Sequence, residues 1–155
     1  MNPFYHKENI TIYHGQAEEI RRELPNNYFG TLLMDGPANF HADTVIDWLP
    51  WVRTEGSVIV MMWDAYAILG QRISSKMPDW KPMANLAPTQ EHGHYASRPV
   101  DAIQELLAQT EGPILDPYMG VGSTLIAAKQ LGRAAVGIER DERWCQTAIR
   151  RLEAA

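Results

Sequence analysis

The segment 114–124, together with residues 137–139, constrains the fold of this chain more than any other feature. Its letters are ILDPYMGVGST: a short apolar run ends in Asp116, and two glycines then precede a helical pattern. A second apolar run ends in Glu139. This order predicts a strand, a tight turn, a helix and a second strand, which is the repeating unit of parallel α/β sheets.

The glycines and acids of this unit indicate a cleft for a nucleotide-like ligand. Gly120 and Gly122 let the backbone turn sharply and approach a ligand closely, and an acid that ends the next strand, Glu139, can accept hydrogen bonds from ribose hydroxyls. The third position of the dinucleotide pattern is not glycine, so the spacing favours an adenosyl ligand without a pyrophosphate over NAD. The alternative is an ordinary tight turn, which the neighbouring acids make less favoured.

The same residues resemble the DNA amino-methyltransferase family. Its cofactor segment reads D-P-F-x-G-x-G-[ST]-T and continues to L-G-R-x-x-x-G-I-E, and residues 116–124 and 131–139 match it almost letter for letter. His94 and the run 98–100 resemble the family's H-x-x-x-[KR]-P-V element, which leads into a helix beside S-adenosylmethionine. The resemblance implies S-adenosylmethionine as the cofactor.

The catalytic half of the family has its counterpart upstream. Residues 10–17 and 32–40 align with the segments that end in the family's catalytic D-P-P-Y motif. That motif precedes the cofactor motif here, which resembles the permuted group of the family. The similarity extends over roughly residues 9 to 153.

The catalytic turn departs from the family pattern and reads D-G-P-A. By resemblance, the Asp35 carboxylate and the Gly36 carbonyl would each accept an N–H of an exocyclic amine on the target base and draw electron density onto its nitrogen. Pro37 is retained, but Ala38 stands where the family has an aromatic ring that stacks on the flipped base. Phe40, two positions further on, is the candidate replacement for that ring.

The resemblance also assigns the cofactor contacts. Glu139 would hold the ribose, the glycine turn would surround the methionine part, and Gln16 stands where the family has an acid that faces the adenine amine. No metal is expected, because two imidazoles at 92 and 94 are poor evidence for a metal site. The predicted cofactor-binding residues are Gln16, Asp35, Arg98, Asp116, Tyr118, Gly120, Gly122, Ser123, Thr124 and Glu139.

Apolar strands alternate with helical patterns, which predicts an α/β fold with a mostly parallel sheet and helices on both faces. We expect a single Rossmann-like methyltransferase domain over 1–155, with a catalytic half at about 9–64, a short insert at about 65–93 and a cofactor half at about 94–153. The expected strands are 10–14, 31–34, 57–63, 80–86, 113–116 and one that ends at 139; the expected helices are 16–24, 43–49, 65–77, one from 99, one ending near 132 and one from 141.

Four acids each follow an apolar strand of this pattern: Asp35, Asp64, Asp116 and Glu139. In an open α/β sheet, ligands bind outside the carboxyl ends of the strands. We therefore expect one crevice to hold the cofactor and the catalytic carboxylate together.

The charge of the chain is unfavourable for binding a DNA duplex. It has 14 basic and 19 acidic residues and a net charge of −5, whereas duplex affinity depends on Lys and Arg side chains that neutralise phosphates. The insert at about 65–93 is too short for a recognition domain. We expect the chain alone to bind DNA weakly, and a homodimer, a second subunit or a single-stranded target to supply what is missing.

The remaining composition favours a soluble, cytoplasmic protein. No run approaches the roughly 18 apolar residues that span a bilayer, and the polar start lacks a signal-peptide pattern. Cys145, the single cysteine, lies among apolar residues at helical spacing, so we expect it in the core rather than in a reactive role.

The sequence therefore predicts an S-adenosylmethionine-dependent methyltransferase that acts on an exocyclic amine of a DNA base, either adenine N6 or cytosine N4. The altered turn at 35–38 leaves a second possibility, a catalytically impaired cofactor-binding subunit that needs a partner. A methylase of RNA, of a nucleotide or of a protein is the third.

Overall fold

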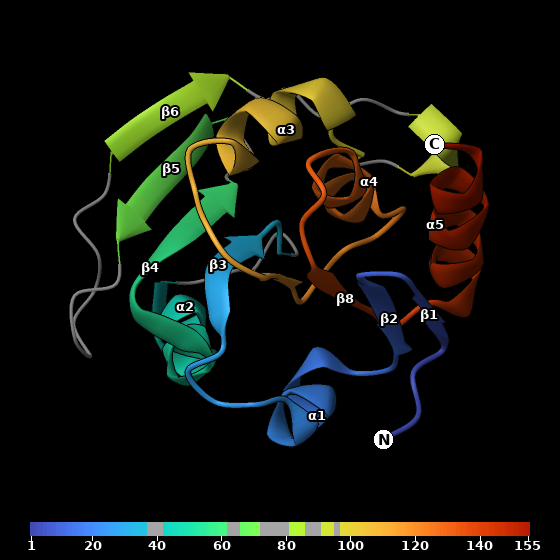
Figure 1. Ribbon diagram of the computed structural model, residues 1–155, viewed down its shortest axis with the longest axis horizontal. Coiled ribbons are helices and arrows are strands. Elements are labelled where there is room, and N and C mark those ends of the chain that lie inside the picture. The colour runs from blue at the N-terminus through green and yellow to red at the C-terminus, as the bar shows by residue number, and fades with distance from the viewer. Residues whose placement is uncertain (37–41, 62–65, 72–80, 86–90, 95–96) are drawn as a thin grey trace.

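The computed structural model describes residues 1–36, 42–61, 66–71, 81–85, 91–94 and 97–155, and within them the strands form a single eight-stranded sheet (Figure 1). The strands are β1 (Tyr5–Lys7), β2 (Ile10–His14), β3 (Phe29–Met34), β4 (Val52–Met61), β5 (Tyr66–Gln71), β6 (Lys81–Asn85), β7 (Ile114–Asp116) and β8 (Ala135–Glu139). The helices are α1 (Ala17–Ile20), α2 (Ala42–Trp48), α3 (Val100–Leu107), α4 (Ser123–Gln130) and α5 (Glu142–Ala154), with short 3-10 turns at Arg21–Glu23, Leu49–Trp51 and Glu91–Gly93.

The middle of the sheet is parallel and its two edges are antiparallel. The strand order is β1-β2-β8-β7-β3-β4-β5-β6. Neighbouring strands from β2 to β4 run parallel, whereas β1 pairs antiparallel with β2, and β5 and β6 continue antiparallel from β4. The carboxyl ends of the five parallel strands therefore meet along one edge of the sheet, where ligands of such folds bind.

The central strands β3 and β7 are buried on both faces, which explains why most of their residues are apolar. In β3, Leu33 packs into the core on one face, and Leu32 and Met34 pack into the core on the other. In β7, Ile114 packs into the first of these cores and Leu115 packs into the second. Successive side chains of a strand point to opposite faces, so a strand covered on both sides lacks the polar alternation of a half-exposed strand.

The helices form two layers, one on each face (Figure 1). Residues of α3, α4 and α5 belong to one buried cluster, and residues of α1 and α2 belong to the other. Cys145 of α5 is fully buried in the first cluster, as expected. This arrangement confirms the predicted α/β fold with a mostly parallel sheet and helices on both faces.

The segment after β4 differs from the prediction. The sequence pattern predicts a helix over 65–77, but the described part of this segment, Tyr66–Gln71, is a strand that pairs with β4 from Ser57↔Gln71 to Met61↔Ala67. The short apolar run YAIL fits either structure by pattern alone, and the free edge of β4 decides the outcome because it offers a full ladder of hydrogen bonds. The helix prediction for this segment is therefore wrong.

Other boundaries shift by a few residues. β4 begins at Val52 instead of Ser57, and the expected end of that strand at 62–63 lies outside the described residues. The predicted helix 16–24 is a single α-helical turn, α1, continued by a 3-10 turn. Pro50 lies at the start of the 3-10 turn that ends α2, which agrees with its expected effect on the helix.

Arg133 ties the other end of the sheet together. Its guanidinium donates to the carbonyls of Leu107 at 2.6 Å and Gly112 at 2.7 Å, and to the hydroxyls of Thr110 and Thr31, each at 3.0 Å. These partners lie at the end of α3, in the segment between α3 and β7, and in β3. Arg133 is therefore a structural residue, far along the strands from their carboxyl ends.

Candidate functional site

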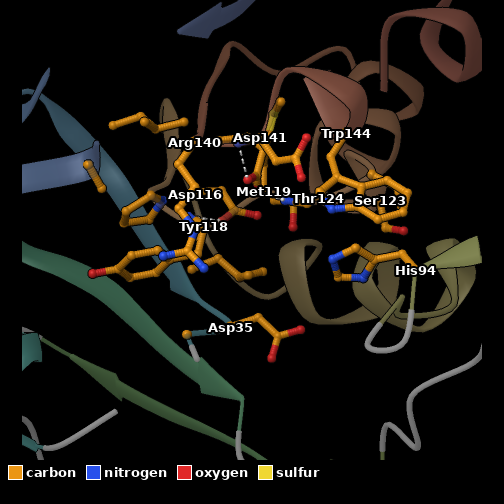
Figure 2. Close-up of a pocket in the computed structure, with 18 of the residues that line it drawn as sticks. Asp35, His94, Asp116, Tyr118, Met119, Ser123, Thr124, Arg140, Asp141 and Trp144 are labelled. Carbon is orange, nitrogen blue, oxygen red and sulfur yellow. Dashed lines mark hydrogen bonds between the residues drawn. The ribbon is translucent and has the colours of Figure 1, made fainter. Parts of the chain in front are cut away.

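A cavity of about 340 Å³ lies at the carboxyl ends of the parallel strands. Its walls come from the turns after β2, β3, β7 and β8, from the end of β4 and from the start of α5, with His94, Arg98 and Ile103 on the α3 side. Figure 2 shows Asp35 and His94 on one side of this space and Asp116, Met119 and Thr124 across from them. Segments from both halves of the sequence therefore form one site.

Most of the predicted site residues line this cavity. Gly122 lies in the same turn without being part of the wall, and Pro37, Phe40 and the strand-end acid Asp64 lie outside the described residues. The predicted residues in the wall are Gln16, Asp35, Gly36, Arg98, Asp116, Tyr118, Gly120, Ser123, Thr124 and Glu139.

The glycine turn between β7 and α4 is held in a left-handed conformation. Gly120 has φ of 52° and Gly122 has φ of 78°, values that side chains disfavour. A Cβ atom on Gly122 would also lie 2.7 Å from the Cβ of Ala148 in α5. Arg151 of α5 donates to the Val121 carbonyl at 2.6 Å and to Ser123 Oγ at 3.2 Å, so the last helix fixes the shape of the turn.

Glu139 holds two backbone amides beside the cavity. Its Oε2 accepts from Gly120 N at 3.1 Å, and its Oε1 accepts from Asp141 N at 2.8 Å. An ionised carboxylate has about four acceptor positions, so each oxygen retains one for a ligand. The two hydrogen bonds from backbone N–H groups therefore orient the Glu139 carboxylate and leave it able to accept from a ligand.

Asp116 is the most deeply buried acid of the site. Only 2% of its surface is exposed, and its Oδ1 accepts from Tyr118 N at 3.0 Å. Burial raises the pKa of Asp116 to about 7; hydrogen bonds from Thr124 and Tyr118 oppose this shift, and the nearby charges of Asp35 and Glu139 add to it. This carboxyl therefore changes its charge near neutral pH.

Asp35 follows β3 and is paired with Arg98. Arg98 Nε donates to Asp35 Oδ2 at 2.8 Å, and Nη2 donates to Oδ1 at 2.9 Å. The exposed fraction is 6% for the Arg98 side chain and 18% for that of Asp35. The ion pair is thus bidentate and mostly shielded from water.

His94 and Trp144 form part of the wall and were not among the predicted site residues. Their rings meet edge to face, with centroids 4.9 Å apart, and the His94 ring packs against Gly120. Burial lowers the pKa of His94, although the charges of Glu139 and Asp35 act in the opposite direction. The neutral imidazole is therefore favoured beside the glycine turn.

Tyr118 closes another part of the wall through a bond to α1. Its hydroxyl donates to Glu18 Oε1 at 3.1 Å, and its ring lies edge-on to Trp48 at 6.5 Å. Burial, followed by the charge of Glu18, raises the pKa of Tyr118 to about 12. Tyr118 therefore acts as a neutral hydrogen-bond donor that links β7 to the segment after β2.

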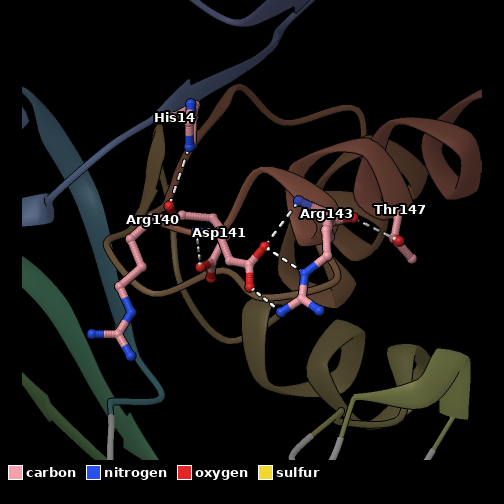
Figure 3. A network of polar contacts seen from close by, with 6 residues as sticks. His14, Arg140, Asp141, Arg143 and Thr147 are labelled. Atoms are coloured by element: carbon pink, nitrogen blue, oxygen red, sulfur yellow. Dashed lines mark hydrogen bonds and ion pairs between the residues drawn. The ribbon is translucent and has the colours of Figure 1, made fainter.

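The connection from β8 to α5 is a polar network (Figure 3). His14 Nε2 lies 3.1 Å from the Arg140 carbonyl oxygen. Asp141 caps α5 by accepting from Arg143 N at 3.0 Å, and the Arg143 side chain, at 2.6 Å, lowers the pKa of Asp141 to about 2. An ionised acid at the first turn complements the helix dipole, so α5 starts at a fixed position beside the cavity.

The described residues contain no group of three or more His, Cys, Asp or Glu side chains arranged to hold a metal ion. No helix in the described part of the chain has the length and apolar character needed to cross a membrane.

Comparison with known proteins gives the chain its relatives. Residues 6–150 match the family model for DNA methylases of the N6/N4 type. The type II methyltransferase M.ScaI of Streptomyces caespitosus is 35% identical over 66 residues, which are 43% of this chain and 22% of that protein. The type II methyltransferase M2.DpnII of Streptococcus pneumoniae is 35% identical over 83 residues, which are 53% of this chain and 28% of that protein.

The fold also has counterparts among solved structures. The crystal structure of the M1.HpyAVI–SAM complex superposes with a TM-score of 0.69 at 18% identity, covering 92% of this chain and 100% of that chain. At this identity the likeness establishes the fold. The curated relatives are much longer than their matched regions, since the alignments cover 22% and 28% of their lengths.

Proposed function

The chain belongs to the N6/N4-type DNA methylase family, and on this premise we propose that it transfers a methyl group from S-adenosylmethionine to an exocyclic amine of a DNA base. One observation carries the proposal. The strand-end carboxylate Asp35 and the glycine turn with Glu139 line the same cavity, so a cofactor and a target amine can be brought together there.

The residues of the cavity suit S-adenosylmethionine. Glu139 keeps an acceptor on each oxygen for ribose hydroxyls, and the side-chain carbonyl of Gln16 can accept from the adenine amine. The backbone of the turn at Gly120 lines the cavity, and carboxyl groups around it favour a cation. When bound, the cofactor supplies a methyl group on positively charged sulfur.

Asp35 and Gly36 would act on the target amine. The lone pair of such an amine is delocalised into the base, which makes the nitrogen a poor nucleophile. A carboxylate that accepts one N–H and a backbone carbonyl that accepts the other return electron density to the nitrogen and hold it still for in-line attack. Asp35 would polarise the amine in this way, and the Gly36 carbonyl needs no particular side chain.

A catalytically impaired subunit is the second candidate, and one departure in sequence favours it. Ala38 replaces the aromatic ring of the family motif, and stacking of a base on such a ring contributes about 1 to 3 kcal/mol. That loss corresponds to roughly 5- to 150-fold in rate or affinity. In this case the chain would bind the cofactor and depend on a partner for methylation.

We further propose that DNA binds weakly to the chain alone and that a second copy or a second subunit supplies recognition. The net charge of −5 opposes phosphate binding, and extruding a base from a duplex requires energy that a small surface does not provide. Electrophoretic shifts at two ionic strengths test this. Tight, sequence-specific binding by the monomer at physiological salt would contradict it.

Calorimetry and labelled methyl transfer separate the two functional candidates. Glu139→Ala should weaken S-adenosylmethionine binding by about 1.5 to 3 kcal/mol, the range of a charge-assisted hydrogen bond. Asp35→Ala should abolish methyl transfer to DNA and leave cofactor affinity largely unchanged. Cofactor binding without any transfer by the parent chain would favour the impaired subunit, and absence of cofactor binding would refute both candidates.

Restoring the family motif tests whether the altered turn limits methyl transfer. Gly36→Pro with Ala38→Tyr should raise methyl transfer if only rigidity and stacking were lost, by about 5- to 150-fold from stacking alone. If the parent chain is already fast and the restored turn slows it, Ala38 is an adaptation of this site and not a loss.

A further inference from the structure

Arg98 directs its charge at Asp35 from the α3 side of the cavity. It comes just before α3, whereas Asp35 comes just after β3, and both line the cavity. Two hydrogen bonds of 2.8 and 2.9 Å join one nitrogen of Arg98 to each oxygen of the carboxylate. The planar guanidinium therefore fixes the plane of the carboxylate as well as its position.

This pairing leaves defined acceptor positions on Asp35. A carboxylate offers about four lone-pair positions, and the two bonds to Arg98 use one on each oxygen. The positions that remain point away from the guanidinium. An incoming N–H donor can therefore approach Asp35 only from a restricted set of directions.

We propose that Arg98 is a positioning residue for the target amine: by gripping both oxygens of Asp35, it orients the carboxylate so that a remaining acceptor position faces the amine, and it is not a contact of the cofactor. This inference rests on the proposed function, in which Asp35 accepts an N–H of the amine. It differs from the cofactor role that the family resemblance implies for Arg98 and assigns the residue to the target side of the cavity.

The charges around Asp35 support this role. Asp116 and Glu139 face the same cavity, and each interacts electrostatically with its neighbours there. Arg98 places a buried positive charge next to the one carboxylate of the three that the proposed chemistry requires to accept from the amine.

Arg98→Lys is the test, because lysine keeps the positive charge but lacks the planar guanidinium that donates to both oxygens of Asp35. With cofactor at saturation, methyl transfer to DNA should fall by about 10- to 100-fold, the scale of a misplaced reacting group. The dissociation constant for S-adenosylmethionine, measured by calorimetry, should stay within about 3-fold of the parent value, since a factor of 3 is under 1 kcal/mol. An Arg98→Lys protein with full transfer rate and weakened cofactor binding would overturn the proposal.

Arg133→Lys is the matched control for a buried arginine with only a structural role. It should lower the melting temperature, because it breaks the bonds to Leu107, Gly112 and Thr31, and it should leave the transfer rate of the folded protein nearly unchanged. If both lysine variants lower stability and rate in proportion, Arg98 is structural and the proposal fails.

A second variant covers the case in which the Arg98→Lys protein does not fold. Arg98→Ala removes the whole side chain, and methylguanidinium added to this protein should restore part of the transfer rate, whereas methylammonium should not. Asp35→Asn combined with Arg98→Ala should be no slower than Asp35→Asn alone, because residues that act as one unit are non-additive. Additive losses, or equal rescue by both cations, would refute the orienting role.

The parent chain separates this inference from the proposed function. A parent chain that binds S-adenosylmethionine and transfers nothing to DNA refutes the proposed function, and the role of Arg98 falls with it. An active parent chain with an equally active Arg98→Lys variant refutes the role of Arg98 alone.

Discussion

Replacing Asp116 by asparagine should make the stability of the protein less dependent on pH. Asp116 is 2% exposed, and burial raises its pKa from the ordinary 3.8 to about 7. Asparagine has nearly the same shape and keeps an oxygen that can accept from Tyr118 N. The variant therefore removes the ionisation while it retains an acceptor for the hydrogen bond from Tyr118 N.

The direction in which stability changes with pH depends on whether the folded or the unfolded state binds the Asp116 proton more tightly. Between about pH 4 and pH 7 the unfolded chain loses the Asp116 proton and the folded protein keeps it, so the folded state binds more protons. The free energy of unfolding must then decrease as pH rises through this window and level off above about 7. The separation between 3.8 and about 7 corresponds to about 4 kcal/mol.

Urea denaturation of both proteins at pH 4.5 and pH 8 measures this effect. All other groups titrate in both proteins, so most of their contributions cancel in the difference. From pH 4.5 to pH 8, the free energy of unfolding of Asp116→Asn should rise relative to that of the parent by about 3 to 4 kcal/mol. A difference that stays constant with pH would mean that folded Asp116 titrates like an exposed acid, and the reasoning from burial would be wrong.

Three further outcomes are expected. Affinity for S-adenosylmethionine should increase from pH 6 to pH 8, because ionised Asp116 attracts the sulfonium, whereas affinity for the uncharged sulfur of the demethylated product should change less; calorimetry with both ligands checks this. Gly122→Ala should lower the free energy of unfolding by about 1 to 3 kcal/mol, and adding Ala148→Gly should recover only the part due to overlap with Ala148, because φ stays at 78°. Arg151→Met should leave the Val121 carbonyl without its bond and lower the free energy of unfolding by about 1 to 3 kcal/mol, as measured by denaturation; an unchanged value would show that the turn holds its shape alone.

The elements around the glycine turn were predictable because their signals are local. The apolar run before Asp116, the two glycines and the apolar run before Glu139 lie within a short stretch of sequence, and each has a direct physical meaning. The convergence of Asp35 with these residues followed from one general rule, since parallel strands bring their carboxyl ends to one edge.

The remaining features depend on contacts that no local pattern encodes. Tyr66–Gln71 is a strand because β4 has an edge to pair with, and the apolar letters alone do not specify that partner. The bond between Arg98 and Asp35 joins two residues that the chain order keeps far apart. Trp144 fits the apolar stripe of its helix by spacing, but it lies in the first turn of α5, where the helix starts beside the cavity.

The order of strands in the sheet has a consequence for how the protein folds. β2 is among the first strands along the chain, yet its parallel neighbour is β8, the last strand, and Ile10 pairs with Ala135. Contacts between such distant residues require closing a long loop before any of its stabilisation is gained, which slows folding. The cavity includes the turns after both β2 and β8. We therefore expect the ability to bind a ligand to appear late in refolding, after β3 and β4 have already paired.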